Sequence, residues 1–208
     1  MTANDQGAEP DEPSGGGAGA APAEAEPAYV STLAASNSYR SWQWYLDGPL
    51  TPGGNAWGAN VDAISTEYSG HGARVGIIDN GFDTTQPDLA GRFDLGLSYD
   101  PHDAAGATSI TPDVSSDAHG TRVAGVLGAS AANGYGMVGV APQATLAGFY
   151  IRYGAGGSSM AEIADLLARQ VNVDVSNNSW GYTQAFSDNF SSSVWSALAD
   201  ALHTGAAQ

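Results

Sequence analysis

The chain contains no cysteine and no lysine among its 208 residues. Without cysteine, neither a disulfide framework nor a thiol nucleophile can be part of the protein. Six arginines stand against 22 acidic residues, a formal net charge of −16, so binding to nucleic acid, which needs cationic neutralisation of phosphates, is not expected. No apolar run is long enough to cross a bilayer, and we expect no membrane-spanning segment. An acidic surface does, however, concentrate cations such as calcium.

The N-terminal region differs in composition from the rest. Residues 1–27 hold six acids, four prolines and five glycines, with no base and no large aliphatic residue after Met1. Such a segment cannot bury enough apolar surface to offset its chain entropy. It also lacks the positive start and apolar core of a signal peptide. We therefore expect a disordered acidic segment over 1–35 and a folded domain over 36–208.

From residue 36 onward, strand-like and helix-like patterns alternate, which predicts an α/β fold with a parallel sheet and helices on both faces. Strands are expected at 73–79, 95–99, 144–151 and 171–176, and helices at 61–68, from 119 onward, at 159–169 and at 189–203. Ser159 and Glu162 form a capping box at the start of one helix. The helix at 189–203 has its apolar positions at Phe190, Val194, Leu198 and Leu202. Aromatic residues indicate an N-terminal arm packed on the core through Tyr39, Trp42, Trp44, Tyr45 and Trp57.

Two titratable side chains stand where these elements end and begin. Asp79 closes the apolar run ARVGIID, so it is expected at the carboxyl edge of a parallel sheet, where α/β folds place their ligands and catalytic groups. His119 opens the stretch HGTRVAG, whose small residues predict a tightly packed helix. Taken singly, Asp79 could cap the Asp-Asn-Gly turn and His119 could be a core or capping residue. If the two meet, a carboxylate would orient a histidine base, the arrangement that activates a hydroxyl nucleophile.

Several blocks, taken in order, carry a family resemblance. They are QWYL (43–46), GHGARVGIID (70–79), the Asp79 block VGIIDNGFDTTQPDL (75–89), HGTRVAG (119–125), NGYGMVGVAP (133–142) and SNNSWG (176–181). From about residue 36 to the last residue, the chain resembles the subtilisin-like serine peptidases, and most closely the kexin/furin branch. The resemblance implies the subtilisin-like fold, truncated before its last third, and a serine endopeptidase with Asp79 as orienting acid and His119 as general base.

The resemblance also implies that the nucleophilic Ser and the oxyanion Asn lie beyond residue 208, so this segment alone is expected to be inactive. Because residues 1–27 do not form a signal peptide, either the enzyme stays inside the cell or its export uses a signal outside this segment; we expect secretion by a route without an N-terminal signal peptide. Ser179, Trp180 and Gly181 match the family segment whose backbone pairs with extended protein or peptide substrates. The alternative for these three residues is a polar strand end with a packed tryptophan.

Calcium is the cofactor that the resemblance implies. Its ligands in the family correspond here to the side chains of Asp88 and Asn133, to backbone carbonyls near Ser130, Tyr135 and Met137, and to Asn37 on the arm, where Asn in place of Asp would weaken the site. Calcium takes several such oxygen ligands. The alternative for Asp88 is a turn cap after Pro87.

The chain departs from the furin pattern where basic side chains would bind. The SWG block is followed by four uncharged residues, Tyr182, Thr183, Gln184 and Ala185. Where the family has an acid after the 144–151 strand, this chain has Arg152 and Tyr153. Asn80 replaces the second Asp of the kexin-type pair. A cationic side chain desolvated without a carboxylate partner is costly. We therefore do not expect cleavage after paired basic residues.

The motif GSSMA (157–161) resembles the block around the family's nucleophile. It precedes SWG instead of following it and lacks the closing Pro, so Ser159 is interpreted as a helix cap.

The sequence leaves two rival functions open. One is a metal-assisted phosphohydrolase with Asp79 as nucleophile, although Gly81 stands where such enzymes need a second acid. The other is a non-catalytic relative that binds extended peptides.

Overall fold

The computed structural model describes residues 37–47, 58–65, 67–102, 109–112, 118–131, 133–153, 156–181 and 193–206, without the side chains of residues 194 and 206. The expected disorder of 1–35 lies outside the described residues. So do Trp57, Phe190 and the run 182–185. No helix in the described part of the chain combines the length and hydrophobicity needed to cross a membrane.

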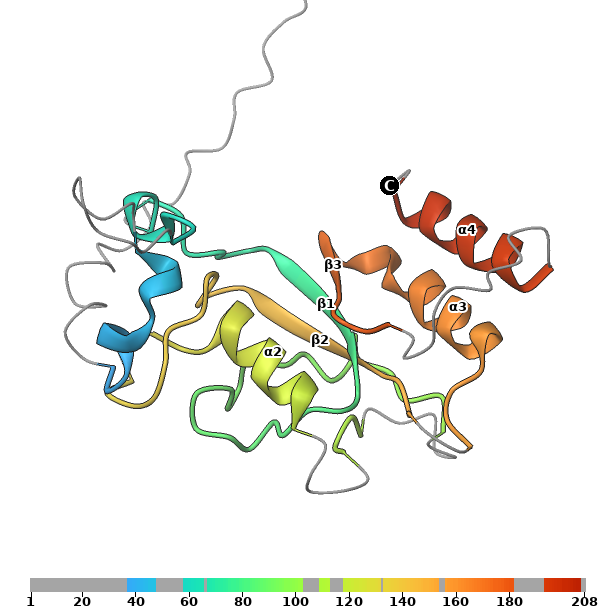
Figure 1. Ribbon diagram of the computed structural model, residues 1–208, viewed down its shortest axis with the longest axis horizontal. Coiled ribbons are helices and arrows are strands. Elements are labelled where there is room, and N and C mark those ends of the chain that lie inside the picture. Colours follow the sequence, from blue (N-terminus) through green and yellow to red (C-terminus); the bar gives the residue numbers. More distant parts are fainter. Residues whose placement is uncertain are drawn as a thin grey trace, which may run out of the picture.

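A parallel sheet of three strands forms the centre of the described structure (Figure 1). Strand β1 (Arg74–Asp79) lies between β2 (Thr145–Tyr150) and β3 (Val175–Asn178). Asp79 pairs with Tyr150 and Ile78 pairs with Asn178, so all three strands end at the same edge. Helix α2 (His119–Gly128) packs on one face of the sheet, and helices α3 (Met160–Ala168) and α4 (Ser193–Ala206) pack on the other. The predicted α/β fold is confirmed.

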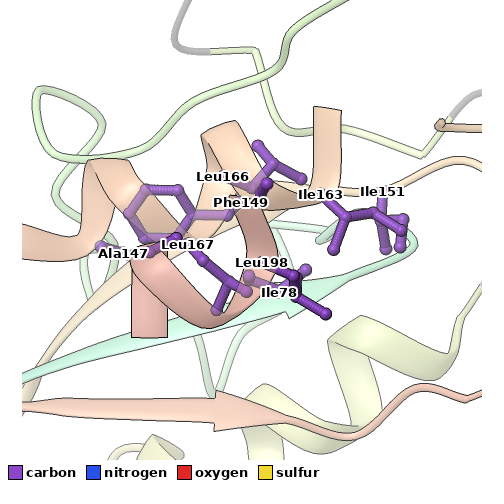
Figure 2. Packing of buried hydrophobic residues seen from close by; sticks show 10 residues of the cluster. Ile78, Ala147, Phe149, Ile151, Ile163, Leu166, Leu167 and Leu198 are labelled. Carbon is purple, nitrogen blue, oxygen red and sulfur yellow. The ribbon is translucent and has the colours of Figure 1, made fainter. Parts of the chain in front are cut away.

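The first core cluster lies under α3 and α4 (Figure 2). Ile163, Leu166 and Leu167 of α3 are buried, as their helical spacing predicts, and they pack on Ala147 and Phe149 of β2. The predicted capping box is confirmed: Ser159 Oγ accepts the Glu162 N–H at 3.3 Å, and the Glu162 carboxylate accepts the Ser159 N–H at 2.6 Å. These bonds satisfy two N–H groups that a helix start leaves without partners.

The second core cluster joins α2 to the opposite face through Val75, Ile77, Leu146 and Ala124. The small residues of α2 all lie on its buried side, namely Gly120, Ala124, Gly125 and Gly128. With almost no side chain on this side, the helix backbone approaches the sheet closely. This close approach fixes where the first residue of α2, His119, stands relative to the end of β1.

Two predicted strands are wrong in their extent. Residues 95–97 form a turn, and only isolated parallel bridges from Phe93 and Tyr99 reach β2. The turn forms because Asp94 Oδ1 accepts the Gly96 N–H at 2.8 Å, a side-chain bond that competes with strand pairing. The strand predicted at 171–176 begins later, at Val175, because the 3₁₀ helix η4 (Arg169–Asn172) occupies its first residues.

Two predicted helices also differ from the structure. The helix expected at 61–68 is only the 3₁₀ turn η3 (Val61–Ala63). Helix α4 extends to Ala206, past the predicted end, and Leu202 is 52% exposed instead of buried. Its buried positions in the described part are Leu198 and Ala201, which pack on α3. The four-residue spacing drifts around a helix of 3.6 residues per turn, which carries Leu202 away from the core.

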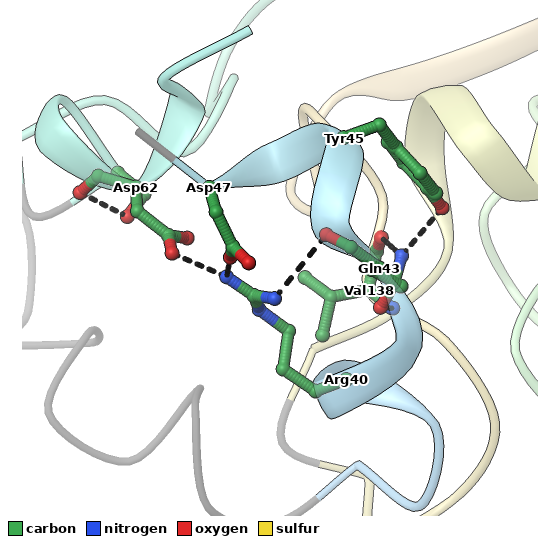
Figure 3. Close-up of polar contacts among 7 residues, drawn as sticks. Arg40, Gln43, Tyr45, Asp47, Asp62 and Val138 are labelled. Atoms are coloured by element: carbon green, nitrogen blue, oxygen red, sulfur yellow. Dashed lines mark hydrogen bonds and ion pairs between the residues drawn. The ribbon is translucent and has the colours of Figure 1, made fainter. Parts of the chain in front are cut away.

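The N-terminal arm is held by polar side chains, contrary to the prediction that its aromatic residues anchor it (Figure 3). Tyr39, Trp42 and Trp44 are 58%, 81% and 57% exposed, whereas Gln43 and Leu46 are buried. The arm comprises the 3₁₀ helices η1 (Arg40–Trp42) and η2 (Trp44–Leu46). The Gln43 side chain donates to Val138 O at 2.8 Å and accepts the Val138 N–H at 2.9 Å. Arg40 pairs with Asp47 and Asp62.

Candidate active site

Asp79 and His119 meet at the carboxyl edge of the sheet. His119 Nδ1 lies 2.8 Å from Asp79 Oδ1 and 3.0 Å from Asp79 Oδ2. The Asp79 side chain is 0% exposed, whereas the His119 side chain is 49% exposed. An ionised carboxylate only accepts hydrogen bonds, so Nδ1 carries the proton and Nε2 keeps its lone pair. A half-exposed imidazole with Nε2 free to accept a proton has the form of a general base.

Asn80 belongs to this site, although the sequence indicated it only as the replacement for an acid. Its side chain is buried, and its Oδ1 accepts the Gly120 N–H at 2.9 Å. Gly120 follows His119 in the first turn of α2, where backbone N–H groups lack partners within the helix. The Asn80 N–H donates to Asp79 Oδ1 at 2.8 Å. Asn80 therefore ties the start of α2 to the end of β1 and orients the Asp79 carboxylate. The Asp-Asn-Gly order could have suggested this role, since Asn both donates and accepts.

Gly120 allows the close approach that this pairing needs. A Cβ at this position would press on the carbonyl oxygen of Gly81 and lie 3.0 Å from the Cβ of Asp79. The first of these neighbours is a backbone atom and the second belongs to a residue of β1, so α2 would have to move. We expect Gly120→Ala to lower the free energy of unfolding by about 1–3 kcal/mol, the usual cost of overpacking. Chemical denaturation measures this loss, with Gly205→Ala, where a Cβ meets nothing within 4 Å, as control. Equal effects of the two substitutions would contradict the role of Gly120.

The segments that follow β2 and β3 leave the sheet at the same edge as Asp79. The Ile151 N–H donates to Asp79 O at 2.8 Å, which holds the end of β2 beside the site. Two residues on, Tyr153 is 48% exposed; burial, together with the negative charge of Asp79, raises the pKa of its phenol to about 12. The phenol therefore stays neutral at physiological pH. The sequence marks Tyr153 only as a position without the expected acid, and its place beside Asp79 follows from the strand pairing.

Ser179, Trp180 and Gly181 follow β3 directly. Ser179 and Gly181 are exposed, and a Cβ at Gly181 would meet nothing within 4 Å. Trp180 is half-buried against the first core cluster, and its Nε1 donates to Asn178 Oδ1 at 3.2 Å. The packed tryptophan fixes the segment to the core, while its exposed neighbours leave the backbone open beside it.

Comparison with known proteins identifies the family. The subtilase family model matches residues 70–208. The chain belongs to the subtilase family of serine peptidases. Human furin is 34% identical over 147 residues, which cover 67% of this chain and 17% of furin. Endoprotease bli-4 of Caenorhabditis elegans is 37% identical over 141 residues, covering 67% of this chain and 14% of that protein.

Solved structures agree with the family. The serine protease of Aeromonas sobria, crystallised in complex with a chaperone, superposes with a TM-score of 0.67 at 28% identity, covering 81% of this chain and 29% of that one. A protease from Pseudoalteromonas arctica superposes with a TM-score of 0.60 at 21% identity, covering 83% of this chain and 56% of that one, and this match supports the fold. This subtilase chain thus spans only part of each relative.

The residues expected to bind calcium lie together between the arm and the loop after α2. Asn37 Nδ2 donates to three oxygens: Met137 O at 2.8 Å, Ser130 O at 3.1 Å and Asn133 Oδ1 at 3.3 Å. The buried Asp88 carboxylate accepts from Asn133 Nδ2 and from the Met137 N–H, both at 2.9 Å. The Tyr135 N–H donates to Asn133 Oδ1 at 3.0 Å. Asp88 therefore holds this loop rather than capping a turn.

Within the described residues, no three His, Asp or Glu side chains gather into a metal-binding group. A cation in this subtilase would therefore depend on the single carboxylate of Asp88 together with amide and carbonyl oxygens, a donor set that calcium accepts. Oxygens bound to one calcium ion at 2.3–2.6 Å are neighbours at about 3 Å from one another. Three such oxygens lie 2.8–3.3 Å from the Asn37 side-chain nitrogen, next to the buried Asp88 carboxylate, so the residues present fit the ion by the kinds of ligand they offer.

Proposed function

We propose that the full-length protein is a serine endopeptidase in which His119 is the general base and Asp79 holds it. The single observation that carries this proposal is the bond, 2.8 Å long, from Nδ1 of the half-exposed His119 imidazole to the buried Asp79 carboxylate. In the proposal, the nucleophilic serine and the oxyanion donor come from sequence that follows Gln208. Residues 1–208 alone would then not hydrolyse peptides.

His119 would act on two protons in turn. Its Nε2 would remove the proton from the serine hydroxyl as the oxygen attacks the peptide carbonyl, and would later deliver that proton to the leaving amine. The imidazolium formed between these steps carries a positive charge 2.8 Å from Asp79 Oδ1. Because Asp79 is shielded from water, its carboxylate stabilises that charge strongly, and it fixes the tautomer that leaves Nε2 free.

The substrate would be a protein or peptide in extended conformation, aligned along Ser179–Gly181 at the end of β3. An exposed backbone beside a packed tryptophan suits strand addition, in which main-chain hydrogen bonds supply affinity for any sequence. Arg152 and Tyr153 at the neighbouring strand end supply no carboxylate for a basic side chain. We therefore propose a specificity other than paired basic residues.

Calcium would stabilise the fold and take no part in the reaction. In the proposal its ligands are Asp88, Asn133, Asn37 and backbone carbonyls of the loop that includes Ser130, Tyr135 and Met137. Bound there, the ion would supply positive charge to a cluster of oxygens and tie the arm to the loop after α2. The two orientations of the Asn37 amide exchange a donor for an acceptor, so this residue could serve the loop both with and without the ion.

The phosphohydrolase alternative is disfavoured by the burial of Asp79. A carboxylate that attacks phosphorus must reach its substrate, but the Asp79 side chain is 0% exposed and both of its oxygens face His119. The non-catalytic peptide-binding alternative keeps the same fold and differs only in the missing nucleophile.

The test is the reaction of the full-length protein with a panel of peptides. We expect hydrolysis without a preference for Arg-Arg before the cleaved bond, and loss of activity after treatment with a fluorophosphonate, which phosphonylates activated serines with loss of fluoride. Residues 1–208 serve as the control and should neither cleave the peptides nor take up the label. Peptide binding without cleavage would favour the non-catalytic relative, and magnesium-dependent activity that survives the fluorophosphonate would favour the phosphohydrolase.

A further inference from the structure

The sequence contains two Asn-Gly pairs, Asn80-Gly81 and Asn133-Gly134. Asparagine is a labile side chain, and a following glycine favours its deamidation because no Cβ hinders attack by the glycine nitrogen on the asparagine side chain. The first pair directly follows β1 and lies beside Asp79, whereas the second lies in the loop after α2. The structure gives these two pairs opposite surroundings.

The pair beside the active site is shielded from water. Asn80 is 8% exposed, and its Oδ1 accepts the Gly120 N–H at 2.9 Å. Gly81 is buried, and a Cβ there would lie 2.8 Å from the Cα of Pro112. Deamidation begins when hydroxide removes the amide proton of the glycine, so burial keeps this pair from reacting. Asn80 is therefore protected as long as the protein stays folded.

The pair in the loop after α2 is open to solvent. Asn133, Gly134 and Tyr135 are all exposed. Asn133 Oδ1 accepts the Tyr135 N–H at 3.0 Å, which folds the side chain back over the Gly134 peptide. The ring closed by this hydrogen bond contains both the side-chain carbon of Asn133 and the backbone nitrogen of Gly134. The two atoms that would react are thus held in one small turn that water can reach.

Two donors polarise the side-chain carbonyl of Asn133. Besides the Tyr135 N–H, the Asn37 amide donates to Asn133 Oδ1 at 3.3 Å. Donors aimed at this oxygen stabilise the negative charge that develops on it when a nitrogen attacks the carbon, as an oxyanion hole does. The nitrogen that would leave, Asn133 Nδ2, donates to Asp88 Oδ1 at 2.9 Å. The loop therefore holds this asparagine with its carbonyl group activated.

We propose that Asn133 is a deamidation site of the folded protein and that Asn80 is not. The Gly134 nitrogen gives its proton to hydroxide and bonds to the side-chain carbon of Asn133. The bond from that carbon to Nδ2 breaks, and ammonia departs with a proton taken from water. One water molecule then opens the five-membered succinimide and leaves aspartate or isoaspartate at position 133. The net change exchanges NH2 for OH without oxidation, and it is independent of the proposed peptidase function.

Deamidation makes the loop depend on a cation. Asn133 Nδ2 now donates to Asp88 Oδ1, and a carboxylate at position 133 replaces this hydrogen bond by repulsion between two like charges. Calcium binds carboxylates readily and offsets that repulsion. This consequence, here called the calcium dependence, rests on the proposed calcium site, whereas the deamidation itself does not.

The experiment follows both pairs in one sample of the full-length protein, treated with a fluorophosphonate against self-cleavage and freed of excess reagent. Trypsin cuts after arginine and yields one peptide for each pair, 75–92 and 123–152. Mass spectrometry records the gain in mass from the exchange of NH2 for OH. We expect Asn133 to deamidate at least about tenfold faster than Asn80, because releasing Asn80 costs its buried hydrogen bond. In urea the two rates should become equal.

The proposal is overturned if the two pairs deamidate equally fast in the folded protein, if Asn133 gains no mass, or if the rates still differ in urea. In that last case the fold would not be the cause of the difference. Absence of peptidase activity would refute the proposed function without altering either rate.

The calcium dependence is measured on Asn133→Asp, which carries the aspartate product, in the full-length protein. In chelator it should melt about 2–4 °C below the wild type, the effect of losing one hydrogen bond. Calcium should remove this deficit. Asn172→Asp, which adds the same charge at an exposed residue of η4, is the control and should melt as the wild type does in both conditions. A deficit of equal size in calcium and in chelator would contradict the calcium dependence.

Discussion

Substitution of His119 by alanine in the full-length protein is expected to lower kcat by a factor on the order of 10⁶, the loss typical of removing the base from a serine triad. A serine hydroxyl is a weak nucleophile until a base accepts its proton. In the described structure, His119 is the imidazole that Asp79 orients toward the exposed side of the sheet edge. KM should change little, because His119 acts on the reacting atoms and does not bind the remainder of the peptide. Single-turnover kinetics of peptide hydrolysis measure the loss.

His203→Ala is the control for this substitution, since His203 is exposed near the end of α4, away from the sheet edge. It should leave kcat unchanged. Asp79→Asn should lower kcat by about 10⁴, because an amide no longer selects the tautomer that leaves Nε2 free. Both active-site variants should bind peptide as tightly as the wild-type protein. If His119→Ala retained more than about a hundredth of the activity, His119 would not be the base.

The central part of the site could be predicted because it depends on local patterns. An apolar run that ends in Asp79 favours a buried strand with its acid at the edge, and a row of small residues after His119 favours a closely packed helix. The parallel pairing then brings both residues to one edge, since the carboxyl ends of parallel strands coincide. Asn80 and Tyr153 were missed as members of the site. The role of Asn80 depends on a hydrogen bond to Gly120, 40 positions away, and Tyr153 is influenced by the charge of Asp79, 74 positions away, and no local pattern encodes either relation.

The contacts that hold the N-terminal arm could not be predicted from the sequence either. Tyr39, Trp42 and Trp44 suggested anchors because aromatic side chains usually supply buried area. The structure holds the arm instead through Gln43, whose amide pairs with the backbone of Val138 as a strand would. A glutamine has no sequence signature for this use. The exposed aromatics also indicate how weakly composition constrains burial at single positions.

Substitution of Asp88 by alanine should destabilise the full-length protein more in calcium than in excess chelator. Part of the loss is independent of any ion, because Asp88 accepts hydrogen bonds from Asn133 and Met137 and is buried. The additional loss in calcium arises from linkage: an ion present at a hundred times its dissociation constant stabilises the folded state by about 2.7 kcal/mol. Thermal melting of the wild type and the variant, each with calcium and with chelator, measures the difference. Asp200→Ala, which removes the same charge from exposed α4, should show no calcium-dependent change.

Asn37→Asp should lower the melting temperature in chelator and raise it in calcium. In chelator, a carboxylate at this position would face Met137 O, Ser130 O and Asn133 Oδ1, which now accept from the Asn37 amide, so the variant should melt below the wild type. In calcium, the added charge would bind the ion more tightly than an amide oxygen, and the variant should melt above the wild type. The sign must reverse if these oxygens surround a cation. If these oxygens served only to hold the arm by hydrogen bonds, the variant would be less stable than the wild type both in calcium and in chelator. That result would refute the proposed calcium site.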